Sequence, residues 1–180
     1  MKFTKKTLFI SRLSLLVSLT LIIQIAGFPQ PITGPLINAM LLITTSLIGC
    51  IGGVTLGCLT PIIAILRGQL PPILASLVPF IAVGNSILVI VFFIVNYRLK
   101  IKVNQIRRFQ VYFAIFSAAV AKFLFLVSTV KIIFPLILMH QVPQKYITLL
   151  MIPQLFTALI GGIIFLTLLK ILDKAGIWHQ

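Results

Sequence analysis

Long apolar runs dominate the sequence, and short segments containing proline, glutamine or basic residues separate them. A hydrocarbon core about 30 Å thick needs a helix of about 20 apolar residues at ~1.5 Å per residue. Runs of this length predict four membrane-spanning helices, at residues 8–27, 74–97, 109–131 and 147–169. The pattern therefore predicts an all-α integral membrane protein, with residues 1–180 forming a single domain.

A fifth apolar run, residues 36–66, is too long for one span. As a single helix its 31 residues would extend roughly 46 Å, well beyond the hydrocarbon core. The run contains the segment GCIGG, and glycine provides the flexible backbone that a break between helices needs. We expect two short helices here, about 36–49 and 52–66, which brings the number of spans to six.

The distribution of charge supports six spans. The chain is 60% hydrophobic and 9% charged, and it carries fifteen Lys and Arg residues against a single acid, Asp173. Basic residues mark the cytoplasmic side of membrane proteins. With six spans, the basic residues of both termini and of the central loop all fall on one side, which predicts cytoplasmic termini. Nucleic-acid binding is not expected, because the Lys and Arg residues lie between apolar runs and form no patch on a soluble domain.

Lys122 interrupts the apolar segment FSAAVAKFLFLVSTVK, and the sequence places no acidic residue near it. A lysine buried near mid-membrane costs at least ~2.5 kcal/mol unless it is compensated, so we expect Lys122 to face a cavity or a partner. The alternative is a side chain that reaches the membrane surface or makes a purely structural contact.

Other polar residues lie in the same outer half of the predicted membrane. At ~1.5 Å per residue, Lys122 and Gln154 fall roughly 10 to 14 Å below the outer surface, with two further polar residues at comparable depth and three near the outer rim. We expect these seven residues to bind a substrate: Lys122, Asn85, Gln154, Thr60, Asn38, Thr33 and Arg67.

Small residues also recur at intervals of four. Such strips permit the close approach of another helix, either from a partner or from the same chain. The residues expected to form a docking surface are Ser14, Ser18, Gly49, Gly53 and Gly57. No metal or other cofactor is expected, because the sequence has no P-loop and no cluster of His and Cys. Catalysis is not expected either, because no span contains an acid and both histidines lie outside the spans.

Several segments together resemble the S components of the energy-coupling factor (ECF) vitamin transporters. These are the basic N-terminus with SRLSLLVS, and the segments PQPITGPLINAMLL, GCLTPIIAILRGQLPP, VPFIAVGNSILV and IPQLFTALIGG. The resemblance covers nearly the whole chain. It implies a six-helix, multi-pass protein of a prokaryotic plasma membrane that captures a vitamin-like small molecule from outside. Its implied partners are a transmembrane T component and two cytoplasmic ABC ATPases.

The resemblance also assigns roles to residues. In the family, small residues four apart in the first helix dock on the T component, and here Ser14 and Ser18 stand in place of the usual alanines. The family's pocket is built largely from the last three helices and covered by the loop after the first. This places Asn85, Lys122 and Gln154 in the pocket, with Thr33 and Asn38 at its lid. Lys122 would then be the cation for an acidic or carbonyl-bearing ligand.

Two other functions fit the sequence. The chain could be an accessory or structural subunit of a membrane complex, in which Lys122 pairs with a carboxylate of a partner. It could also be a gradient-driven or facilitative carrier, although a carrier of this kind would have to rely on broken helices because the spans contain no acids.

Overall fold

The computed structural model describes residues 4–69, 72–98, 109–133 and 144–174. Over these residues the chain is helical, without strands, which confirms the predicted all-α fold. Its six α-helices are α1 (Lys5–Ile25), α2 (Gln30–Ile48), α3 (Cys50–Leu66), α4 (Val78–Arg98), α5 (Phe109–Ser128) and α7 (Gln144–Lys174). A 3-10 helix, η1 (Pro72–Leu77), leads into α4, and a π-helical turn, η3 (Thr129–Ile133), continues α5.

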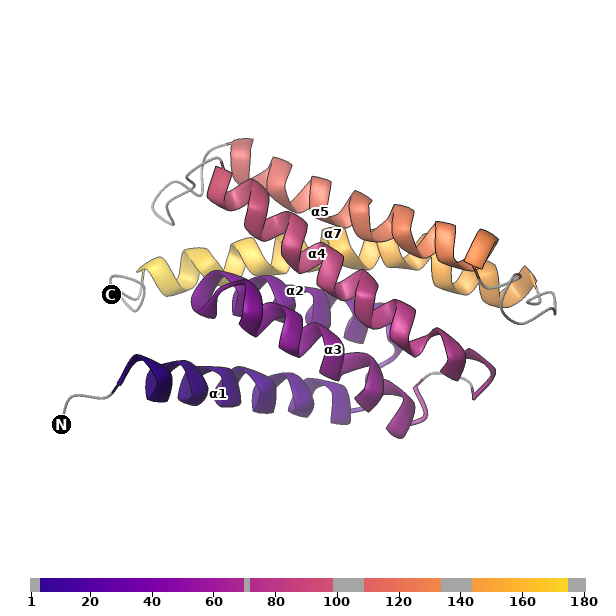
Figure 1. Ribbon diagram of the computed structural model, residues 1–180, viewed down its shortest axis with the longest axis horizontal. Coiled ribbons are helices and arrows are strands. Elements are labelled where there is room, and N and C mark those ends of the chain that lie inside the picture. Colours follow the sequence, from indigo (N-terminus) through magenta and orange to yellow (C-terminus); the bar gives the residue numbers. More distant parts are fainter. Residues whose placement is uncertain (1–3, 70–71, 99–108, 134–143, 175–180) are drawn as a thin grey trace.

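The helices form an elongated bundle, in which the start of α1 and the end of α7 lie at the same end (Figure 1). Helix α2 packs against α3 and α7, helix α4 packs against α3 and α5, and α1 lies at the edge against α2 and α3. Five of the helices are long and apolar enough to cross a membrane, and α3, with 17 residues, is shorter. The apolar core includes Phe92 of α4 and Phe165 of α7, whose rings meet edge to face with centroids 5.5 Å apart.

The break between α2 and α3 lies at Gly49. Its φ angle of 102° falls in a region that residues with a side chain rarely adopt, so glycine is required here. The Gly49 N–H donates to the carbonyl of Thr45 at 3.0 Å, which closes the last turn of α2. The prediction that residues 36–66 form two helices is therefore confirmed.

The start of α2 differs from the prediction. The proline-bearing segment before residue 36 was expected to be a loop, but the helix begins at Gln30. Pro31 occupies the second helical position, where a missing N–H removes no helical hydrogen bond. Thr33 consequently lies on a helix and not in a loop, whereas Asn38 lies on a helix as expected. The role of both residues at a lid stays a prediction. The Thr33 hydroxyl donates back to the carbonyl of Phe28 at 2.8 Å.

Two glycines let neighbouring helices come into close contact near Asn38 and Asn85. A methyl group added at Gly57 of α3 would lie 3.2 Å from Cβ of Asn85 on α4. A methyl group added at Gly161 of α7 would lie 2.7 Å from both Cβ of Asn38 and the carbonyl oxygen of Pro35 on α2. The absence of a side chain at these two positions lets the backbones approach, and this approach places Asn38 and Asn85.

Gly53 and Gly57 serve the alternative use of small residues, which is packing within the same chain, and their assignment to a docking surface for a partner is wrong. Gly53 and Gly57 are buried where α3 packs inside the bundle, and a methyl group at Gly53 would lie 2.8 Å from Cγ1 of Val89. Gly49 serves the turn between α2 and α3. Ser14 and Ser18, in contrast, are exposed on α1, so they stay available to a partner.

Candidate functional site

A cavity lies among the helices, in the half of the bundle away from the start of α1 and the end of α7. All six α-helices contribute lining residues. Water-sized centres can occupy about 80 Å³ of the cavity, and the empty space between the lining atoms, including that at its mouth, is about 550 Å³. One water needs only about 10–15 Å³ by the first measure, so the cavity is large enough for a small molecule.

Six of the seven residues expected to bind a substrate line this cavity. They come from five different helices, and they are Thr33, Asn38, Thr60, Asn85, Lys122 and Gln154. Arg67, the seventh, lies at the end of α3, and its Nη2 donates to the carbonyl of Ile25 at the end of α1, at 2.6 Å. This bond ties α1 to α3 outside the cavity lining.

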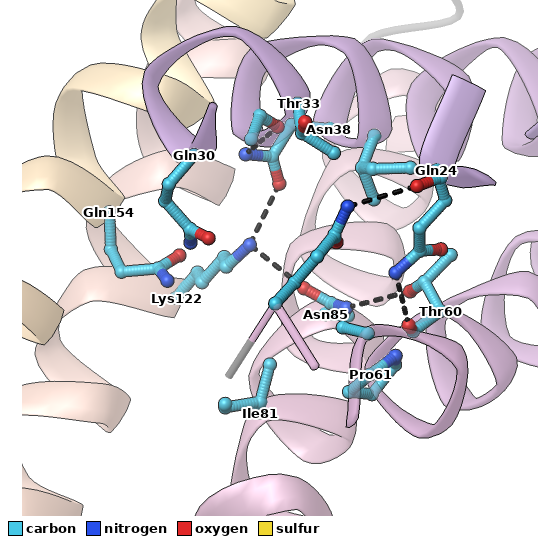
Figure 2. Close-up of a pocket in the computed structure, with 14 residues that line it drawn as sticks. Gln24, Gln30, Thr33, Asn38, Thr60, Pro61, Ile81, Asn85, Lys122 and Gln154 are labelled. Atoms are coloured by element: carbon cyan, nitrogen blue, oxygen red, sulfur yellow. Dashed lines mark hydrogen bonds between the residues drawn. The ribbon is translucent and has the colours of Figure 1, made fainter. Parts of the chain in front are cut away.

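Lys122 lies at the centre of the site, with only 3% of its surface exposed. Its Nζ donates to Oδ1 of Asn38 at 2.7 Å and to Oδ1 of Asn85 at 2.8 Å (Figure 2). These short distances are typical of hydrogen bonds from a charged donor. The alternative in which Lys122 reaches the membrane surface is therefore wrong. The alternative of a structural contact is correct in part, because the lysine joins α5 to α2 and α4.

The orientation of the Asn85 amide is fixed by groups on α3. Its Nδ2 donates to the carbonyl of Gly57 and to the hydroxyl of Thr60, both at 3.2 Å. The Gly57 carbonyl is available because residue 61, four positions later, is a proline and has no N–H to donate in the helix. Since both hydrogens of the amide point to α3, its oxygen faces Lys122.

The Asn38 amide is held in the same manner. Its Nδ2 donates to the carbonyl of Gly34 at 3.0 Å and lies 3.5 Å from the hydroxyl of Thr157 on α7. Two asparagines thus present oxygens to Lys122 before any ligand arrives. An ammonium group has three N–H donors, and the third N–H of Lys122 has no hydrogen-bond partner among the residues that the structure describes.

The charge of Lys122 is balanced by neutral dipoles. Of the side chains described along the cavity wall, Lys122 is the only charged one. Asp173, the sole acidic residue of the sequence, follows Gln154 by 19 positions on α7, which is roughly 28 Å along the helix axis. The arrangement is a cationic cavity with one N–H donor that no described residue uses, and it suits an electron-rich group on a small molecule.

Three polar side chains of the cavity were not predicted: Gln24, Gln30 and Gln69. The Gln24 side chain is 2% exposed, and its Nε2 donates to the carbonyl of Thr60 at 2.7 Å. The Gln69 Nε2 donates to the backbone carbonyl of Gln24 at 2.9 Å. Gln24 could have been predicted as a site residue, because it is the lone polar residue in the apolar run LIIQIAG. Gln30 and Gln69 gave no such signal, because they lie in polar, proline-bearing segments where glutamine is ordinary.

Replacing Arg67 by alanine is expected to leave ligand affinity nearly unchanged, because the guanidinium bonds the Ile25 carbonyl and does not line the cavity. The loss of an exposed hydrogen bond from a charged donor should lower the stability slightly, by at most about 1 kcal/mol. Ligand titration of purified Arg67→Ala against the wild type measures this. A large loss of affinity would return Arg67 to the binding site.

Comparisons with family models, with curated proteins and with solved structures find no match to this chain. Among the described residues, no group of three or more His, Cys, Asp or Glu side chains could hold a metal ion. The fold and the site define a class: an α-helical bundle with five helices of membrane-spanning length and apolarity, and with a cationic, amide-lined cavity between them.

Proposed function

We propose that this chain is a multi-pass membrane protein that captures a small molecule in the Lys122 cavity. The observation that carries the proposal is the buried ammonium group, which is oriented by two asparagine oxygens and lines the cavity. A lysine in a membrane interior is costly and is typically functional. With both termini in the cytoplasm, as the charge distribution favours, the cavity lies in the outer half of the membrane and receives its ligand from outside.

The more specific proposal is that the protein is an S component of an ECF-type importer in a prokaryotic plasma membrane. The resemblance of its sequence segments supports this role, and a capture site in the outer half agrees with it. The sequence has no P-loop, so the energy for import comes from partners, namely a T component and two ABC ATPases. The exposed Ser14 and Ser18 on α1 are the proposed docking positions for the T component.

The burial of Lys122 favours this role over an accessory subunit. In an accessory subunit, a carboxylate of a partner protein would have to reach Nζ, but Lys122 is 3% exposed and is surrounded by the bundle. A small molecule enters such a cavity more readily than a side chain on a partner helix does. A facilitative carrier would share the cavity but would need no ATPase.

Native mass spectrometry of the tagged full-length protein, gently extracted from its own membranes, tests the proposal. We expect a bound small molecule, together with T and ATPase subunits in part of the population. Uptake of that molecule by cells should stop when the ATPase subunits are deleted. A ligand-free protein bound to an unrelated membrane subunit would contradict the capture role, and uptake that persists without the ATPases would favour the carrier.

A further inference from the structure

We propose, on the basis of the capture function above, that the substrate is a small monocarboxylate. Its carboxylate accepts a hydrogen bond from the third N–H of Lys122 and lies beside Gln30 and Gln154. The uncharged remainder of the substrate lies along the apolar wall of the cavity. A carboxylate matches the charge of this site, its hydrogen-bond donors and its size.

The first step is the charge of the site. Lys122 supplies one positive charge, and both of its hydrogen-bond partners are neutral amides. A ligand with one negative charge neutralises this cation. A phosphate monoester carries about −1.5 to −2 charges and would leave excess negative charge buried, because no second cation is found along the described wall. A buried charge without a partner is strongly unfavourable, so the site favours a monoanion.

The second step is the arrangement of donors. Figure 2 shows the side chains of Gln30 and Gln154 lying on the side of Lys122 away from Thr60 and Gln24. Both glutamines line the cavity. A primary amide offers two N–H donors, and the lysine adds its third. A carboxylate has two oxygens that accept hydrogen bonds in one plane, so one cation and two flanking amides match it.

The remaining cavity space determines what the rest of the ligand, beyond its carboxylate, can be. Beyond the lysine, the wall is formed by apolar residues of α2, α3 and α4, which are Ile37, Pro61, Ala64 and Ile81. The Gln24 and Gln69 amides line the cavity as well. Their nitrogens donate to the backbone carbonyls of Thr60 and Gln24, and the buried Oε1 of Gln24, without a partner among the described residues, can accept one hydrogen bond from the ligand. The space open to water-sized centres, about 80 Å³, is several times the ~10–15 Å³ that one water needs. The body of the ligand is therefore small, largely apolar and uncharged.

Three probes that share a phenyl ring test the inference: benzoate, benzamide and phenyl phosphate. Near pH 7 they carry a single negative charge, no charge and close to two negative charges. The full-length protein in detergent is first freed of endogenous ligand by dialysis, and its melting temperature is measured with each probe at equal millimolar concentrations. We expect benzoate to raise the melting temperature most. Comparable or larger stabilisation by benzamide or by phenyl phosphate overturns the monocarboxylate assignment.

Asn85→Asp is the most informative variant, because it places a carboxylate where an amide oxygen now lies 2.8 Å from Lys122 Nζ. The Thr60 hydroxyl, 3.2 Å from the amide nitrogen, can turn and donate to the new oxygen. The bond from the amide to the Gly57 carbonyl is lost, so thermal unfolding without ligand is measured first to show that the variant is folded. The internal ion pair removes the positive charge that the ligand needs. We expect the apparent affinity for benzoate to fall at least about tenfold, a change of about 1.4 kcal/mol.

Lys122→Gln complements this variant and should also lose the benzoate effect. Unchanged stabilisation by benzoate in both variants overturns the inference, and so does the absence of stabilisation by benzoate in the wild type. The capture function is judged separately by native mass spectrometry. A released small molecule that is neutral, cationic or a phosphate ester would refute the monocarboxylate class and leave the capture function standing.

Discussion

Replacing Lys122 by methionine is expected to lower the affinity for the captured ligand by well over tenfold. Methionine has a similar length and no charge, so the variant removes the cation that faces the ligand. It also leaves the oxygens of Asn38 and Asn85 without their donor, at a cost of about 1–3 kcal/mol for each buried group. Ligand titration of the purified variant measures the affinity, and co-purification with the proposed T and ATPase partners measures assembly, which should persist.

Lys131→Met is the matched control. Lys131 follows on the same helical segment, in the π-helical turn η3, and its side chain is exposed. The same loss of charge there should leave ligand affinity unchanged. Normal affinity in the Lys122 variant would remove Lys122 from the binding site. Loss of assembly with normal ligand binding would instead support the accessory role.

Gly161→Ala is expected to lower both the stability of the bundle and its ligand affinity. The new methyl group would lie 2.7 Å from the Pro35 carbonyl oxygen and 2.7 Å from Cβ of Asn38, so α2 and α7 must move apart. Overpacking of this kind costs about 1–3 kcal/mol, against a gain of about 1 kcal/mol from the higher helix propensity of alanine. Because the shift displaces Asn38, ligand affinity should fall as well. Thermal unfolding in detergent and ligand titration measure both effects.

Gly84→Ala provides the comparison for this prediction. Gly84 is also a buried glycine inside a helix, but its added methyl group would meet Cδ2 of Leu126 at 3.2 Å. The end of a leucine side chain can move by a small rotation, whereas the backbone of α2 cannot. We expect Gly84→Ala to be close to neutral. Equal stability of the two variants would show that the α2–α7 contact is looser than the structure indicates.

The sequence by itself determined the helical architecture of this protein. Long apolar runs are hydrophobic enough to form membrane-spanning helices without help from any particular partner, so their number and approximate positions follow from local composition. The break near GCIGG followed from the length limit on one span. Lys122 could be predicted as a site residue from the sequence, because a lone cation in an apolar run needs compensation wherever the helix packs.

Only the tertiary structure decided what compensates that cation. The Asn38 and Asn85 oxygens approach Lys122 from positions 84 and 37 residues away in the sequence. These separations become contacts because Gly57 and Gly161 let neighbouring helices pack closely, and because Pro61 leaves a carbonyl for the Asn85 amide. The depth of each residue in the membrane could group the polar residues. It could not show which way each side chain points around its helix axis. Only the packed structure shows that Gln24 of α1 lines the cavity and that Arg67, at the end of α3, bonds the end of α1 outside the cavity lining.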